Sequence, residues 1–316
     1  MDGSVGGAAE LLAVRFEVDR PHLTAVARRL LGSAGEADDA VQDAWLRARR
    51  ADLTGVENLT GWLTTVVTRV CLNQLRTRRA RREEPLEAAP ERAEPDTGGD
   101  PAREALLADE VGVALLVVLD TLSPAERVAF VLHDMFAVPF EDIAPLVEKT
   151  PAATRQLASR ARRRVRGRAP GDAETPGPGA SGTPGRDPGR ARKAVEAFLA
   201  ATRGGNLEAL VALLDPDVVL RADALVIPTP EAVTVRGAER VARGAMAAVA
   251  RAQFTGLALL DGEFGLVMAP FGRLRLVLAF TVEDGLITGI DVVAEPARLA
   301  AVEIAAVEIG VVEEGR

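Results

Sequence analysis

The spacing of apolar residues predicts a chain that is helical in its first half and mixed in its last third. Apolar positions recur every three to four residues in several early segments, as they do in amphipathic helices. Pro21 is expected to divide the first of these segments, because proline lacks the amide hydrogen that a helix interior needs. The predicted helices cover Glu10–Leu31, Glu36–Arg50, a stretch from an N-cap at Thr60 to Arg82, Glu104–Leu119, and a stretch from an N-cap at Ser123 to Met135.

Residues 140–168, FEDIAPLVEKTPAATRQLASRARRRVRGR, predict two short helices joined by a turn. Thr150 stands at an N-cap position and Pro151 at the first helical position, where a missing amide hydrogen costs nothing. Pro145 is expected to shorten the first helix. At about 100° per residue, Leu157, Ala161 and Val165 share one side of the second helix.

The opposite side of that second helix is basic and polar, which matches a helix-turn-helix that places its second helix in the major groove of DNA. Arginine can contact guanine with two hydrogen bonds, glutamine can contact adenine, and further arginines suit phosphates. A solvated basic helix end is the alternative, since cations favour helix C-termini. The expected DNA-contacting residues are Arg155, Gln156, Ser159, Arg160 and Arg163.

Two further surfaces have an unusual composition. Arginines gather at a second helix end, Arg76 to Arg82, and two such ends in one chain are typical of a polyanion-binding protein. The helix from Glu36 carries a polar side with one apolar member, which is typical of a partner surface, although single exposed leucines are common. That side consists of Asp39, Gln42, Asp43 and Leu46.

The last third of the chain has a different pattern. Residues 83–103 and 169–189 are rich in Pro, Gly and polar residues, so we expect linkers there. Asp261-Gly262, Phe271-Gly272 and Asp284-Gly285 are turn signals between strand-like runs. Helices followed by a curved antiparallel sheet predict an α+β domain. Its helices are expected at 192–203, 206–214 and 238–251, and its strands at 218–224, 232–236, 254–260, 266–269, 273–283 and 286–293.

Composition narrows the possible functions. The net charge is −8, but the basic clusters are local, and charges further apart than about 10 Å are screened from one another. One cysteine, Cys71, and two isolated histidines, His22 and His133, leave no metal or cofactor site to predict. Aromatic residues make up 3% of the chain and tyrosine is absent, so few stacking platforms for single-stranded bases exist. Because no signal peptide or long apolar span is present, we expect a cytoplasmic protein without a membrane partner.

Four segments resemble the extracytoplasmic-function sigma factors of bacterial RNA polymerase. They read GEADDAVQDAWLRA, GWLTTVVTRVCLNQLRTRRARR, LSPAERVAFVLHDMF and FEDIAPLVEKTPAATRQLASRARRR, and the resemblance covers about residues 8–168. It implies a non-enzymatic factor with core RNA polymerase and promoter DNA as partners, and a region 2 helical bundle followed by a region 4 helix-turn-helix. It also implies that the Asp39, Gln42, Asp43 and Leu46 side docks on polymerase and that the Arg155 to Arg163 face reads the −35 element. Contacts to the −10 element are implied for Asn73, Arg76, Arg78 and Arg79.

The segment AVEAFLAATRGGNLEALVALLDPDVVLRADA resembles the SnoaL-like fold, a cone-shaped α+β barrel related to nuclear transport factor 2. The combination resembles the SigJ-like subgroup of sigma factors, in which a fused C-terminal domain regulates the factor in cis. The implied regulatory contacts are Asp223, Glu295, Pro296, Arg298 and Leu299. The expected domains are region 2 at 8–82, region 4 at 104–168 and the SnoaL-like domain at 190–316, with linkers at 83–103 and 169–189.

Two alternatives stay open. SnoaL-like barrels include cyclases and isomerases that use an acidic residue in an apolar cavity, and burial would raise the pKa of Asp223 or Asp291 towards a useful value. Such a pocket also suits a small-molecule ligand that is bound without catalysis. The other alternative is a ligand-sensing helix-turn-helix regulator, which leaves residues 36–82 unexplained.

Overall fold

The computed structural model describes residues 3–83, 100–167, 187–226 and 231–307. The chain forms two compact units. The first comprises the described residues up to 107 together with 119–162, and the second comprises 108–118 and the described residues of 163–309. Helices α5 (Val113–Thr121) and α8 (Pro151–Arg166) contribute residues to both units.

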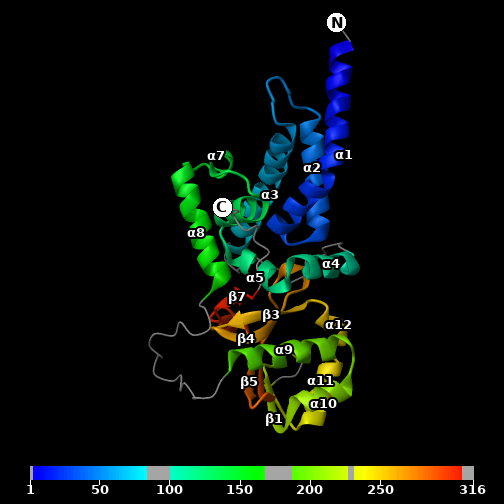
Figure 1. The fold of residues 1–316 in the computed structure, drawn as a ribbon, viewed down its shortest axis with the longest axis vertical. Coiled ribbons are helices and arrows are strands. Elements are labelled where there is room, and N and C mark those ends of the chain that lie inside the picture. Colours follow the sequence, from blue (N-terminus) through cyan, green and yellow to red (C-terminus); the bar gives the residue numbers. More distant parts are fainter. Residues whose placement is uncertain (1–2, 84–99, 168–186, 227–230, 308–316) are drawn as a thin grey trace. The chain divides into compact units, whose positions relative to one another are not determined.

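The first unit begins with three mutually packed helices, α1 (Gly3–Leu31), α2 (Ala34–Ala48) and α3 (Leu59–Glu83) (Figure 1). Phe16, Leu23 and Leu63 lie in its core with almost no exposed surface. The prediction that Pro21 divides the first helix is wrong, because α1 continues through it. Pro21 lies on the exposed side, so water can hydrate the carbonyl that loses its partner, while Phe16 and Leu23 are buried on either side of it.

Two helix starts differ from the expected ones. Helix α2 begins two residues early because Ser33 is its N-cap, with its hydroxyl accepting a hydrogen bond from the Glu36 amide at 3.4 Å. Helix α3 is capped by Asn58, whose side-chain oxygen accepts from the Gly61 amide at 3.0 Å, and not by Thr60. The Thr60 hydroxyl donates to Asp19 instead, at 2.8 Å.

The predicted helix over 104–119 is in fact two helices, α4 (Pro101–Val111) and α5, separated at Gly112 with φ +86°. The predicted cap at Ser123 is confirmed, because Ser123 and Glu126 form a capping box at the start of α6 (Pro124–Phe130). A π-helical turn, η2 (Val131–Met135), ends that helix.

The helix-turn-helix is confirmed in its main features. Helix α7 (Phe140–Ile143) is short and stops before Pro145, and Glu148 occupies the turn with φ +56°. The Thr150 hydroxyl accepts from the Ala153 amide at 3.2 Å, as expected of the N-cap of α8.

The C-terminal domain lies in the second unit and contains a seven-stranded sheet in the order β2-β1-β6-β5-β4-β3-β7. The expectation of a purely antiparallel sheet is wrong at one place, since β1 runs parallel to β6 with Leu220 opposite Ile290. Strand β7 was not predicted, because three residues are too short to show alternation. The strands are β1 (Leu214–Ala222), β2 (Val233–Arg236), β3 (Thr255–Leu260), β4 (Glu263–Met268), β5 (Leu276–Glu283), β6 (Leu286–Val293) and β7 (Ile304–Ala306).

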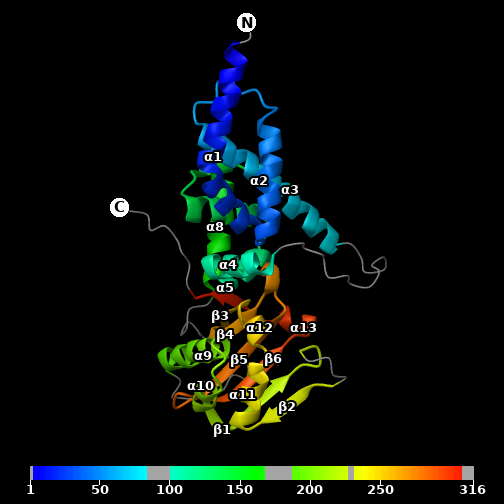
Figure 2. The same cartoon turned by 90° about the vertical axis from the view of Figure 1, so that its right-hand side faces the viewer.

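Helices α9 and α11 pack against the strands of this sheet (Figure 2). Asp261-Gly262 and Asp284-Gly285 form the predicted tight turns, and all four residues have positive φ. The predicted architecture, two all-α domains followed by an α+β domain, is therefore confirmed. The helices of this domain are α9 (Pro188–Arg203), α10 (Leu207–Leu213), α11 (Ala238–Met246), α12 (Val249–Ala252) and α13 (Pro296–Leu299), with a 3-10 turn, η3 (Pro270–Gly272).

The two predicted linkers fall largely on residues 84–99 and 168–186, which lie outside the described residues. At their borders, Glu83 ends α3, residues 101–103 open α4 and residues 188–189 open α9, so these positions are helical. Within the described part of the chain, no helix combines the length and the apolar character needed to cross a bilayer.

Candidate functional site

Helix α8 presents the predicted DNA-contacting residues on one face. These five residues are all exposed and follow the spacing i, i+1, i+4, i+5, i+8, whereas Leu157, Ala158, Ala161 and Val165 on the other side are buried. The structure therefore brings together Arg155, Gln156, Ser159, Arg160 and Arg163.

Ion pairs hold α8 against the helices that precede it. The Arg162 Nε donates to the buried Asp134 carboxylate at 2.5 Å, and Arg160 lies 3.4 Å from Glu126. The Arg155 guanidinium lies over the Phe140 ring, 5.1 Å from its centroid. Contacts of this kind reduce the conformational freedom of the arginine side chains.

The predicted −10 contacts at the basic end of α3 differ in exposure. Asn73, Arg76 and Arg79 are exposed, and Arg76 lies 3.2 Å from Glu148. Arg78 is engaged within the unit, because it donates to the Leu31 carbonyl at 3.0 Å and forms an ion pair with Glu36.

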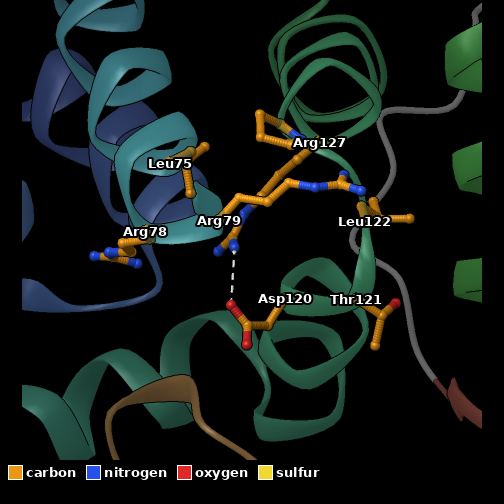
Figure 3. Close-up of a pocket in the computed structure, with 8 residues that line it drawn as sticks. Leu75, Arg78, Arg79, Asp120, Thr121, Leu122 and Arg127 are labelled. Carbon is orange, nitrogen blue, oxygen red and sulfur yellow. Dashed lines mark ion pairs between the residues drawn. The ribbon is translucent and has the colours of Figure 1, made fainter. Parts of the chain in front are cut away.

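Arg78 and Arg79 also line a pocket of about 240 Å³ beside α5 and α6 (Figure 3). Arg127 extends across it towards Asp120, with 3.7 Å between Nη1 and Oδ1. The Arg127 side chain is almost fully buried and also donates to the Arg29 carbonyl at 3.4 Å. It therefore joins α6 to the end of α1 and to the end of α5.

Helix α2 presents the predicted polymerase-docking residues together. Asp39, Gln42, Asp43 and Leu46 are exposed at the spacing i, i+3, i+4, i+7, and Leu46 is 45% exposed. The opposite face is buried in the three-helix core. Substitutions on the exposed face therefore leave the core packing untouched.

Glu104 is a residue that the sequence reasoning missed. Its carboxylate is buried and accepts from the Ser33 hydroxyl at 2.8 Å, the Ala34 amide at 2.8 Å and the Gly35 amide at 3.1 Å. A carboxylate in this position satisfies the unpaired amides at the start of α2 and interacts favourably with the helix dipole. The signal available in the sequence was its spacing, because Glu104 shares a helix face with the buried Leu107, Ala108 and Val111.

In the C-terminal domain, Asp223 contacts the segment 294–298, which contains other predicted regulatory residues. Its carboxylate accepts from the amides of Ala294 (3.0 Å) and Glu295 (3.1 Å) and pairs with Arg298. Burial by itself raises the pKa of Asp223, but the two amides and the Arg298 guanidinium outweigh it, so the pKa lies below its usual value. The expectation that the pKa of Asp223 is raised overall is therefore wrong.

Replacing Asp223 with Asn should destabilise the C-terminal domain by about 1 kcal/mol at neutral pH. A carboxyl whose folded pKa is lowered contributes stability above its unfolded pKa of about 4 and loses it as pH falls through the folded value. The melting temperatures of wild type and Asp223→Asn should therefore differ most near pH 7 and converge in acid. A constant difference from pH 7 to pH 3 would show that the carboxylate charge has no such role.

A cavity of about 400 Å³ lies in the same domain, between the helices and the sheet. Neither candidate acid lines it. Asp291 is partly exposed and lies 3.6 Å from Arg221, while its neighbours Ile290 and Val292 face the cavity.

Cys71 and the histidines carry no chemistry that we can assign. Cys71 is buried in the core, and this burial raises the pKa of its thiol to about 12. The described residues contain no cluster of three or more His, Cys, Asp or Glu side chains that could hold a metal ion.

Comparison with known proteins identifies the chain. Residues 16–81 match Sigma-70 region 2 and residues 112–165 match Sigma-70, region 4. The ECF RNA polymerase sigma factor SigJ of Mycobacterium tuberculosis (strain ATCC 25618 / H37Rv) is 37% identical over 298 residues, which cover 89% of this chain and 91% of SigJ. The chain belongs to the ECF sigma factors of RNA polymerase.

One further relative and one solved structure each cover about nine-tenths of this sigma factor. The probable ECF RNA polymerase sigma factor SigI of Mycobacterium tuberculosis (strain CDC 1551 / Oshkosh) is 33% identical, over 91% of this chain and 94% of SigI. The crystal structure of SigJ matches 91% of this chain and 98% of its own, with 32% identity and a TM-score of 0.40. The two Sigma-70 matches and the sequence identity to SigJ and SigI show that this sigma factor works in transcription initiation, with core RNA polymerase and promoter DNA as partners.

Proposed function

We propose that this sigma factor docks on core polymerase through α2, contacts the −10 element through α3 and the −35 element through α8, and is regulated in cis by its C-terminal domain. The docking residues are Asp39, Gln42, Asp43 and Leu46. The −10 contacts are Asn73, Arg76 and Arg79, with Arg78 joining them once its pair with Glu36 opens. The −35 contacts are Arg155, Gln156, Ser159, Arg160 and Arg163. Domain boundaries at 8–82, 104–168 and 190–316 belong to this proposal, and both Sigma-70 matches lie within them.

Contacts inside the second unit support the regulatory part of the proposal. A methyl group added at Gly256 in β3 would lie 2.8 Å from the Cβ of Val113 in α5, so these two backbones approach closely. Gly167, directly after α8, makes a similarly close approach to Ala305 in β7. Strands β3 and β7 are neighbours at one end of the sheet. Two region 4 segments therefore contact that end, one of them next to the helix proposed to read DNA.

Charge and chain length also support regulation in cis. Residues 190–316 contain 13 Arg and Lys against 17 Asp and Glu, a net charge of −4, which complements the basic ends of α3 and α8. The short connection at 169–189 keeps the domain at a high effective concentration, so that weak contacts are populated. We propose a further regulatory contact at Glu295, Pro296 and Arg298, which are exposed, and at the half-buried Leu299, in the segment that Asp223 holds.

We also propose that the C-terminal domain is not an enzyme. The described residues that line its cavity include no Asp, Glu or His, so acid–base catalysis of the cyclase type has no group there to carry it.

A Gly256→Ala substitution tests the regulatory contact. The added methyl group should overpack the contact with Val113 at a cost of about 1–3 kcal/mol, which would shift a closed arrangement towards an open one and raise promoter-dependent transcription. Gly244→Ala is the matched control, because a methyl group at Gly244 meets no atom within 4 Å. Transcription rates that do not differ between the two variants would argue against this contact as a regulatory one.

A further inference from the structure

The cavity of the C-terminal domain has an almost entirely apolar wall. Helices α9, α11 and α12 and the facing strands contribute side chains such as Phe198, Val241, Leu266, Leu278 and Ile290. Its volume, about 400 Å³, falls within the range of small-molecule sites in proteins. A ligand that fits this wall must have an apolar body.

The polar groups of the wall leave few hydrogen-bond donors for a ligand. Thr202 and Thr255 are buried, and their hydroxyls already donate to backbone carbonyls, those of Phe198 at 2.8 Å and Arg251 at 3.2 Å. Charged donors come from Arg240 and Arg251, which line the cavity and are exposed, so they lie at its opening.

Neither of these two guanidinium groups has an ion-pair or hydrogen-bond partner among the residues that the structure describes. Other arginines nearby are engaged. Arg243 pairs with Glu239 at 2.7 Å, and Arg203 donates to the Thr255 carbonyl at 2.7 Å. The described lining contains no acidic residue, so the opening is positively charged.

We propose that this cavity binds an amphipathic anion, with an apolar chain or ring system inside and a carboxylate or similar head group at Arg240 and Arg251. A head group at the opening avoids the large cost of burying a charge, and a guanidinium can hold a carboxylate with two parallel hydrogen bonds. Binding of such a ligand is an activity separate from the sigma-factor function. It does not depend on regulation in cis, because the cavity can bind a ligand whether or not binding changes transcription.

Isothermal titration of the full-length chain with decanoate tests the proposal, with decyltrimethylammonium as a cation of equal chain length. We expect saturable binding of decanoate at one site and no comparable binding of the cation. The double variant Arg240→Gln/Arg251→Gln should weaken decanoate binding about tenfold or more. Arg236→Gln/Arg243→Gln is the matched control, because it also removes two positive charges, at exposed residues that do not line this cavity.

A second variant tests whether the apolar part of the ligand lies inside the cavity. Ala245 lines the cavity from α11, where leucine is an acceptable helix residue, so Ala245→Leu should fill part of the space and abolish decanoate binding. Circular dichroism and the melting temperature show whether each variant is folded, and Ala222→Leu in β1 repeats the test from the sheet. Equal binding of the anion and the cation, or decanoate binding unchanged in the folded double-arginine and cavity-filling variants, would overturn the proposal, as would an absence of saturable decanoate binding to wild type.

Discussion

Reversing Asp39 and Asp43 to arginine should abolish the binding of this sigma factor to core RNA polymerase. Both carboxylates are exposed one turn apart on α2, beside Gln42 and the exposed Leu46. A charge reversal at a docking surface replaces attraction by like-charge repulsion, which costs several kcal/mol. The buried face of α2 is unchanged, so the three-helix core should remain folded.

Co-purification with core polymerase measures this effect. The matched control is Glu10→Arg/Glu57→Arg, which changes the net charge equally at two exposed residues outside the α2 face. We expect the control to bind as wild type does. If the Asp39 and Asp43 variant still co-purifies with polymerase, or if the control loses binding to the same extent, α2 is not the docking surface.

Substitutions at Arg155 and Arg163 should separate base reading from phosphate binding. Arg155 lies near the start of α8 next to Gln156, where a recognition helix meets base edges, and Arg163 lies two turns later. Arg155→Ala should cost about 1–3 kcal/mol and relax the preference at particular −35 positions. Arg163→Ala should weaken binding to all sequences alike and reduce the salt dependence by the equivalent of about one phosphate contact.

Binding of the polymerase holoenzyme to a set of −35 variants, measured at several salt concentrations, distinguishes the two roles. Arg164→Ala serves as the control, because at 100° per residue Arg164 lies on the side of α8 opposite Arg155. Identical profiles for Arg155→Ala and Arg163→Ala across the promoter set would refute this division.

Features fixed by local chemistry could be predicted from the sequence. Thr150 and Pro151 set the start of α8, the spacing of Leu157, Ala161 and Val165 set its buried face, and the Asp-Gly pairs set two turns of the sheet. Each depends on residues a few positions apart. The grouping of the predicted α2 and α8 surfaces follows from the same helical periodicity.

Features that depend on distant residues could not be predicted in this way. Glu104 caps α2 from 70 positions away, and Asp223 accepts hydrogen bonds from amides 71 and 72 positions away, which lowers a pKa that burial alone would raise. Arg78 is one of a run of arginines, yet its pairing with Glu36 distinguishes it from its exposed neighbours. The division of α4 from α5 depends on the left-handed conformation at Gly112. Glycine adopts left-handed and right-handed conformations with similar ease, so its presence alone does not predict a break in a helix.

Promoter-dependent transcription with core polymerase tests the central claim, control of a sigma factor by its own C-terminal domain, most directly. The comparison is between the full-length chain and a chain ending at Arg168, on the same promoter and over a range of salt concentrations. The truncated chain loses the close contacts of β3 with Val113 and of β7 with Gly167. We predict higher transcription from the truncated chain, with the difference shrinking as salt rises and screens the attraction between the acidic domain and the basic helix ends. Equal transcription from the two chains at every salt concentration would contradict regulation in cis.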